Sequence, residues 1–124
     1  MTKQVGGYKI IDGLNLKLDE DIKFIEIERA GKSVILGIFH YENHQQTVFI
    51  DKYEVTAERG CGIGSEGYLL LRNYFKKKGI RLIKLKASRG LEDGPWDNHH
   101  PYTFWVNKCG FTPRGEFVED DLTC

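Results

Sequence analysis

A glycine-rich stretch in the middle of the chain is the clearest candidate for a ligand-binding loop. Residues Glu58–Gly67 read ERGCGIGSEG and place four glycines in ten residues, directly before the apolar run YLLLRNYF. That run has helical spacing, so the glycines precede a helix N-terminus. The unpaired N–H groups and the positive dipole end of such a terminus attract anions, and glycines let an anion approach the backbone. The stretch therefore predicts an anion site.

Two nucleotide-binding motifs fit this stretch poorly. Gly62–Gly67 matches GxGxxG, but a dinucleotide-binding unit also needs an acidic residue about 20 positions later. The sequence offers Lys84 and Lys86 there instead. A phosphate loop of the GxxxxGKS type is excluded because no Lys-Ser or Lys-Thr pair follows the glycines. A turn without a ligand remains an alternative, although it explains only one or two of the glycines.

The elements before the stretch are predicted strands. Between Ile22 and Val55 the segments IKFIEIE, SVILGIFHY and QTVFIDKYEV are rich in β-branched and aromatic residues. The breaks between them, Arg29–Lys32 and Glu42–Gln45, are short and polar. Connections this short join antiparallel neighbours, so the first half of the chain is predicted to be a meander.

The elements after the stretch are a predicted helix and a strand. Tyr68, Leu71 and Phe75 form one apolar stripe, three lysines crowd the last turn, and Gly79 is the expected residue after the helix. IRLIKLKAS then reads as a strand that returns parallel to the one before the helix, with its alternating lysines on a wet side.

The C-terminal part predicts a loop, a second helix and one or two closing strands. Ser88–His100 is a loop by composition, and Pro101 suits the first turn of a helix that runs from Tyr102 to Cys109 and ends at Gly110. The closing strands would lie within Phe111–Cys124.

The frame Arg59–Gly64, R-x-x-G-x-G, resembles the acetyl-CoA motif Q/R-x-x-G-x-G/A of the GCN5-related N-acetyltransferases, the GNAT family. The resemblance covers roughly Phe24–Phe111, because a meander precedes the motif, a helix follows it, and WVNKCGF stands where the family has a segment such as FYEKLGF. It implies an α/β (α+β) class fold with a mixed, mostly antiparallel sheet, a central splayed pair of parallel strands, and flanking helices.

By this resemblance, the cofactor is acetyl-CoA. The N–H groups of the six residues Gly60, Cys61, Gly62, Ile63, Gly64 and Ser65 would hold its pyrophosphate, and Arg59 would add charge or fix the loop. Gly62 and Gly64 would keep side chains out of the way of the pyrophosphate. The pantetheine arm would run between the strands TVFIDKYEV and IRLIKLKAS, with backbone groups of Tyr53 and Val55 holding the arm and polarising the thioester carbonyl.

The sequence departs from the family in its candidate acid. The family commonly has a tyrosine four residues before the glycine of GF, and that position is Val106, which cannot donate a proton. Tyr102 lies one helical turn earlier on the same face and is the candidate acid, with aromatic packing as its alternative role. Cys61 has no nearby base that would make it a nucleophile.

Glu54 is the candidate base, because family members often take the base from this strand. Strand alternation predicts that Asp51, Tyr53 and Val55 share one face, with Lys52 and Glu54 on the other. A solvated surface carboxylate is the alternative role for Glu54. His99 and His100 are further base candidates, and Glu92, Asp93, Trp96 and Asp97 in the same loop could shape an acceptor pocket.

The resemblance implies an N-acetyltransferase that moves an acetyl group from acetyl-CoA to a primary amine of a small molecule or a protein. The alternative is a catalytically silent module that binds CoA or a protein partner, which Val106 favours. Only Gly7–Glu20 precedes the predicted meander, so an early helix that normally walls the acceptor site is expected to be reduced or missing. The site would then be open to a protein or peptide amine, or a second copy of the chain in a homodimer could complete it.

Composition sets the remaining expectations. The 124 residues suit a single domain spanning 1–124, and a formal net charge of zero offers no field that would attract nucleic acid or a membrane. The N-terminus lacks a signal-peptide pattern and no window reaches the length of a membrane span, so we expect a cytoplasmic protein. Cys61, Cys109 and Cys124 form no CxxC pair, and no HExxH motif occurs, so no metal site is expected.

Overall fold

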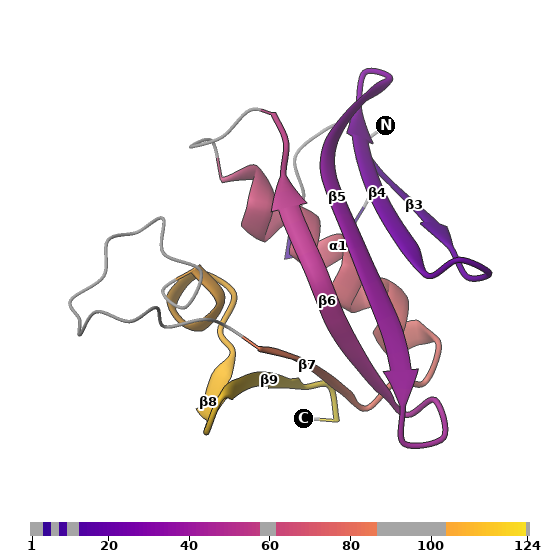
Figure 1. Cartoon of the computed structure of the whole chain (residues 1–124). Coiled ribbons are helices and arrows are strands. Elements are labelled where there is room, and N and C mark those ends of the chain that lie inside the picture. Colours follow the sequence, from indigo (N-terminus) through magenta and orange to yellow (C-terminus); the bar gives the residue numbers. More distant parts are fainter. Residues whose placement is uncertain (1–3, 6–7, 10–12, 58–61, 87–103, 124) are drawn as a thin grey trace.

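The computed structural model describes residues 4–5, 8–9, 13–57, 62–86 and 104–123. Its main sheet contains the seven strands β3 (Leu14–Asp19), β4 (Phe24–Arg29), β5 (Lys32–Glu42), β6 (Thr47–Val55), β7 (Leu82–Lys86), β8 (Thr112–Arg114) and β9 (Phe117–Asp121), in the spatial order β3-β4-β5-β6-β7-β9-β8. The short strands β1 (Gln4–Val5) and β2 (Tyr8–Lys9) pair with each other. The helix α1 (Ile63–Lys77) crosses one face of the main sheet (Figure 1).

Strands β3 to β6 form an antiparallel meander, in which each strand pairs with the next. The three strands predicted between Ile22 and Val55 are therefore confirmed. Strand β3 was not predicted, although Leu14, Leu16 and Leu18 alternate toward the core. Residues 20–23 join β3 to β4 directly.

Helix α1 contributes the predicted apolar stripe to the core. Tyr68, Leu71 and Phe75 are each at most 1% exposed and pack with buried residues of β4 to β7, among them Ile25, Phe39, Val48 and Ile83. Burying a side chain of this size contributes about 1.5–3 kcal/mol, so the stripe fixes the helix on the sheet. The helix ends at Lys77 with Lys78 as its C-cap, and Gly79 follows in the left-handed conformation with a φ of 91°, as its position predicted.

Strands β6 and β7 form the predicted parallel pair around α1, but they remain paired over only three positions. Thr47, Val48 and Phe49 pair with Leu82, Ile83 and Lys84. Beyond Phe49 and Lys84, β6 continues to Val55 without pairing with β7. We call this point of separation the fork. It is the splayed parallel pair that the sequence resemblance predicted.

A β-bulge divides β6 just beyond the fork. Ile38 pairs with Lys52 while the next residue, Phe39, pairs with Ile50, so Asp51 is an extra residue in β6. Such an insertion reverses the alternation of side chains along the strand. Tyr53 and Val55 consequently face α1, as Ile50 does before the bulge. The prediction that Asp51 shares their face is wrong, because its carboxylate points to His40 on the opposite face.

The C-terminal elements close the sheet beyond β7. The predicted second helix is represented among the described residues by η1 (Phe104–Lys108), a π-helical turn in which Cys109 N–H donates to the Phe104 carbonyl at 3.1 Å. Strand β9 pairs antiparallel with β7, and β8 pairs with β9 at the edge. Asp120 of β9 accepts hydrogen bonds from Tyr68 Oη at 2.6 Å and Arg72 Nε at 2.7 Å, which ties α1 to the C-terminal strands.

Candidate functional site at the fork between two parallel strands

Helix α1 begins directly at the glycine-rich stretch. Gly62 is the N-cap residue and has a φ of 77°, a conformation that glycine adopts without strain. A Cβ atom added at Gly62 would have no described heavy atom within 4 Å. Glycine has no side chain that could cap the helix, and no side-chain hydrogen bond from the N-cap is found. As at any helix start, the first N–H groups of α1 have no partner within the helix. The helix therefore presents donors and a positive dipole end next to open space.

The glycines at positions 64 and 67 have a different physical reason. A Cβ atom at Gly64 would lie 3.1 Å from the Phe104 ring and 3.2 Å from Val55. A Cβ atom at Gly67 would meet Ile35, Ile27 and the Tyr53 hydroxyl. Both glycines are buried and let α1 approach the sheet closely. The glycine pattern thus combines a turn residue with two packing residues.

Tyr53 links β6 to the first turn of α1. Its hydroxyl donates a hydrogen bond of 2.6 Å to the Gly64 carbonyl oxygen. Its ring packs edge-on against Trp105 at 5.1 Å and stacks with Phe104 at 6.4 Å. Burial, with a smaller contribution from Cys109, raises the pKa of Tyr53 well above its ordinary value, so the phenol stays protonated and keeps donating. The N-terminal end of α1 is held on β6 by this bond.

The fork provides the second part of the site. Antiparallel pairing with β5 satisfies one edge of β6 as far as Val55, while the other edge has no β7 partner beyond Phe49. Backbone groups on such an edge can pair with an extended ligand, as an added strand would. The edge runs from the fork toward the end of β6, from which the chain leads to the N-terminus of α1.

Comparison with solved structures identifies this arrangement. PaiA N-acetyltransferase from Thermoplasma acidophilum, solved in complex with coenzyme A, aligns with a TM-score of 0.59 and 17% identity over 79% of this chain and 59% of its own. A GNAT-family acetyltransferase from Bacillus anthracis aligns with a TM-score of 0.64 and 15% identity over 84% of this chain and 69% of its own. The chain has the GNAT fold.

The E. coli protein YhhK, solved bound to coenzyme A, has the same fold, with a TM-score of 0.58 and 16% identity over 85% of this chain and 75% of its own. The alignment with PaiA covers 59% of PaiA, so this chain spans less than two thirds of its length. No protein-family model matches the sequence, and the search of curated proteins found no match. The identities are low, so the likeness shows the GNAT fold, with the mixed sheet and flanking helix that the sequence predicted.

The predicted cofactor-binding residues fall into two groups in this GNAT fold. Tyr53 and Val55 lie on β6 with their side chains toward α1, and Gly62 to Ser65 form the N-cap and first turn of α1. Ser65 Oγ donates to the Gly62 carbonyl at 3.1 Å, which closes this turn. Arg59, Gly60 and Cys61 lie outside the described residues.

The candidate acid and base are only partly described. The side chain of Glu54 is 48% exposed and lies 3.7 Å from Lys52 Nζ, on the sheet face away from α1. Tyr102, His99 and His100 lie outside the described residues. Val106, at the position where the GNAT family commonly has tyrosine, is half-buried against the hydrophobic core.

The face of the main sheet opposite α1 carries no helix among the described residues, and we call it the open face. At the fork it holds four charged or titratable side chains, His40, Glu42, Asp51 and Lys84, together with the rings of Phe49 and Phe117. We call this group the polar cluster, and the sequence reasoning missed it. His40 Nδ1 lies 2.7 Å from Asp51 Oδ2, and His40 Nε2 lies 3.0 Å from Glu42 Oε2. Hydrogen bonds to Asp51 and Glu42 raise the pKa of His40 above its ordinary value, against a smaller opposing effect of partial burial.

Aromatic rings support this cluster on the open face. The His40 ring stacks on Phe49 at 5.1 Å, and Phe49 meets Phe117 edge-on at 5.8 Å. Lys84 Nζ lies 5.2 Å from the centre of the Phe117 ring and 3.6 Å from Glu42. Register in the β5–β6 hairpin was the signal that could have revealed the cluster, since His40 directly opposes Phe49.

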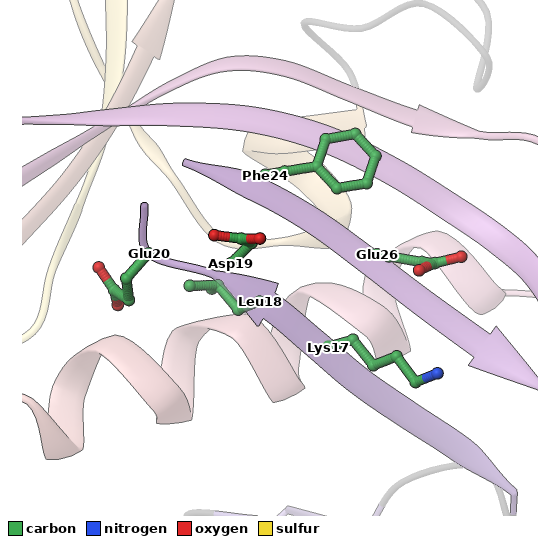
Figure 2. A pocket seen from close by; sticks show the side chains of 6 residues that line it. All are labelled: Lys17, Leu18, Asp19, Glu20, Phe24 and Glu26. Carbon is green, nitrogen blue, oxygen red and sulfur yellow. The ribbon is translucent and has the colours of Figure 1, made fainter. Parts of the chain in front are cut away.

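A hollow of about 540 Å³ lies elsewhere, along the edge formed by β3 and β4 (Figure 2). It is lined by Lys17, Leu18, Asp19, Glu20, Phe24 and Glu26. Its charged groups already have partners, because Lys17 pairs with Glu28 at 3.1 Å and Asp19 accepts from the N–H groups of Asp21 and Ile22. This hollow is separate from the fork, because β5 lies between these strands and the β6–β7 pair.

Other site chemistries find little support in the described part of the chain. His, Cys, Asp and Glu side chains do not gather there in groups of three or more that could hold a metal ion. Burial, with a contribution from Asp120, raises the pKa of the Cys109 thiol to about 12, which makes it a poor nucleophile. Neither described helical element has the length and hydropathy of a membrane span.

Proposed function

We propose that this chain is an N-acetyltransferase that moves the acetyl group of acetyl-CoA to a primary amine. The observation that carries the proposal is the fork between β6 and β7 next to the uncapped, glycine-led N-terminus of α1. A helix N-terminus suits a pyrophosphate, and a strand edge that has separated from its neighbouring strand suits the amide groups of a pantetheine arm. PaiA and YhhK, which share the fold, were both solved with coenzyme A.

In this proposal the N–H groups from Gly60 to Ser65 hold the pyrophosphate, and Arg59 adds positive charge. The arm runs along the edge of β6 that has no β7 partner, where backbone groups near Tyr53 and Val55 bind it and polarise the thioester carbonyl. Tyr102 is the proposed acid for the departing thiolate, and Glu54 is the base that the sequence suggested. The Tyr53 side chain holds the first turn of α1 in place for this binding.

The acceptor is proposed to be the amine of a protein or peptide. The open face carries no helix over β3 to β6 among the described residues, so a large acceptor has access to the fork from that side. A second copy of the chain could cover part of this face. A broad acceptor screen in which only small-molecule amines were acetylated would contradict the proposed acceptor class.

A pair of matched variants tests cofactor binding. Asparagine and aspartate are nearly isosteric, both tolerate positive φ, and position 62 has room for a side chain. Gly62→Asp places a carboxylate beside the proposed pyrophosphate, so we expect its Kd for acetyl-CoA to rise at least about tenfold over that of Gly62→Asn. Calorimetric titration of the wild type and both variants measures this difference.

The same titration can also contradict the proposed pyrophosphate site. NAD serves as the control ligand, because GxGxxG also occurs in dinucleotide-binding proteins. If the wild type binds NAD and not acetyl-CoA, or if both variants bind acetyl-CoA equally, the proposed pyrophosphate site is wrong.

A second candidate function is a catalytically silent module that binds CoA or a protein partner. The observation that favours it is Val106, a half-buried side chain without an ionisable group where the family commonly has tyrosine. Release of CoA thiol in the presence of an amine panel separates the two functions, since only the enzyme releases it faster than buffer does.

A further inference from the structure

The reactive end of the cofactor can be placed from the topology, and this step rests on the proposed function. The pyrophosphate site follows the end of β6, and the arm runs back along the edge of β6 that lacks a β7 partner. That edge ends at the fork, where Phe49 and Lys84 restore pairing. The thioester at the tip of the arm therefore comes to lie near the fork and the bulge at Asp51.

The polar cluster of the open face lies at this same point. His40 belongs to β5 and directly opposes Phe49, the last β6 residue that pairs with β7. Asp51 is the bulge residue itself, and its carboxylate is turned to His40. The imidazole remains reachable from solvent, because the His40 side chain is 44% exposed.

We propose that His40, oriented by Asp51, removes the proton from the ammonium group of the acceptor amine. In the neutral imidazole the Asp51 carboxylate, 2.7 Å from Nδ1, holds the proton on that nitrogen, and Nε2 acts as the base once it has released the proton that it shares with the Glu42 carboxylate. Glu42, 3.0 Å from Nε2 and 41% exposed, attracts the cationic acceptor to the same nitrogen. The acceptor is then held by a carboxylate and deprotonated by the neighbouring imidazole.

The charged groups around His40 agree with this role. Asp51 approaches from β6 and Glu42 from β5, while Lys84 of β7 reaches the cluster through Glu42. The hydrogen bonds to Asp51 and Glu42 raise the pKa of His40 above its ordinary value. Glu54, the base that the sequence suggested, lies on the same face but pairs with Lys52 at 3.7 Å, outside the cluster, so His40 replaces Glu54 as the base in this proposal.

The proton and electron balance of the step is complete without another reactant. Nε2 takes one proton from the ammonium group, and the nitrogen lone pair then attacks the thioester carbonyl carbon. The C–S bond breaks with its electron pair on sulfur, and the second proton from nitrogen neutralises the thiolate, either directly or by restoring the proton that the proposed acid Tyr102 has given to it. The products are the amide, the CoA thiol and an imidazolium, which returns its proton to water.

Single-turnover acetyl transfer tests the proposal, with Nα-acetyl-lysine amide and an unblocked dipeptide as probe amines. We expect His40→Gln to lower the transfer rate about 100-fold. The matched control is His44→Asn, because His44 is an exposed histidine in the β5–β6 turn with a φ of 56° that asparagine tolerates. Acetyl-CoA binding is measured by calorimetry on each variant and should stay unchanged, which shows that each variant is folded.

The pH profile gives a readout that a structural role would not change. The rate of acetyl transfer should rise with pH as His40 loses its proton, which gives the pH profile an acidic limb. Glu42→Gln should move this limb to lower pH, because it removes a group that raises the pKa of His40. Equal rates for His40→Gln and His44→Asn, or an unmoved limb, would overturn the role of His40. A wild type that binds acetyl-CoA but acetylates neither probe would also overturn it and leave cofactor binding intact. A wild type that does not bind acetyl-CoA would overturn the proposed function itself.

Discussion

The two ends of α1 are held in different ways. At the C-terminal end, the Glu20 carboxylate accepts hydrogen bonds from the side chains of Tyr41, Tyr74 and Lys78 at 2.5–3.0 Å. At the N-terminal end, the helix starts on a glycine without a side-chain cap and is held by packing and by the Tyr53 hydroxyl. Polar side chains stabilise the C-terminal end, whereas the N-terminal end leaves its first backbone N–H groups without a partner in the helix, as the proposed pyrophosphate site requires.

The largest expected effect concerns close packing at the N-terminal end. Gly64→Val inserts a side chain against Phe104 and Val55, so we expect the free energy of unfolding to fall by about 3 kcal/mol. Chemical denaturation measures the change, with Gly62→Asn as the control, because position 62 has room and asparagine accepts its φ. If the two variants were equally stable, the distinction between packing glycines and the turn glycine would not hold.

A smaller effect is expected at Tyr53, which joins β6 to α1. Tyr53→Phe removes the hydrogen bond to Gly64 but keeps the ring contacts with Trp105, so we expect a loss of about 1 kcal/mol in unfolding free energy. Because the bond positions the first turn of α1, the affinity for ADP should fall by the same factor as that for CoA, while pantetheine binding stays unchanged. Weakened pantetheine binding would show instead that Tyr53 acts on the arm.

The smallest effect is expected at the C-terminal end. Glu20→Gln removes the charge that Lys78 faces at 2.7 Å, and since both side chains are more than a third exposed, solvent screening limits the loss of unfolding free energy to about 0.5 kcal/mol. Partial burial would raise the pKa of Glu20, but hydrogen bonds from Lys78, Tyr74 and Tyr41 outweigh it and lower that pKa.

The pH dependence of this variant follows from the sign of that shift. The stabilisation is fully present above the unfolded pKa of about 4.3 and is lost as the pH falls through the lower folded pKa. The stability gap between the wild type and Glu20→Gln should therefore be constant near neutral pH and close under acid conditions, as followed by thermal unfolding. Acetyl-CoA affinity should not change, because this end of α1 is distant from Gly62. A stability difference that widened in acid would contradict the lowered pKa of Glu20.

Periodicity explains which elements could be predicted from the sequence. The stripe of Tyr68, Leu71 and Phe75 defined α1, and runs of β-branched residues defined β4 to β7. Strand β3 was missed because its leucine alternation is short and lies in a segment interpreted by its length alone. The second helix, predicted over Tyr102–Cys109, includes the described turn Phe104–Lys108, but the π-helical hydrogen bond from Cys109 has no signal in a hydrophobic pattern.

The candidate site was harder to predict than the fold, since it depends on register. The glycine motif located the N-terminus of α1, but only the contacts show that Gly64 and Gly67 serve packing. Likewise, the faces of Asp51 and Tyr53 were assigned by strict alternation, which the bulge breaks. His40 and Asp51 lie eleven positions apart, and only the paired hairpin brings them together.

The bulge at Asp51 also bears on how this chain can change. Removing one residue there would restore simple alternation and exchange the faces of the outer half of β6, so that Tyr53 and Val55 would turn outward and Lys52 and Glu54 would turn toward α1. A deletion at this point therefore exchanges every side chain of the outer half at once, whereas a substitution alters a single one. We therefore expect β6 to tolerate a substitution better than the deletion of a residue.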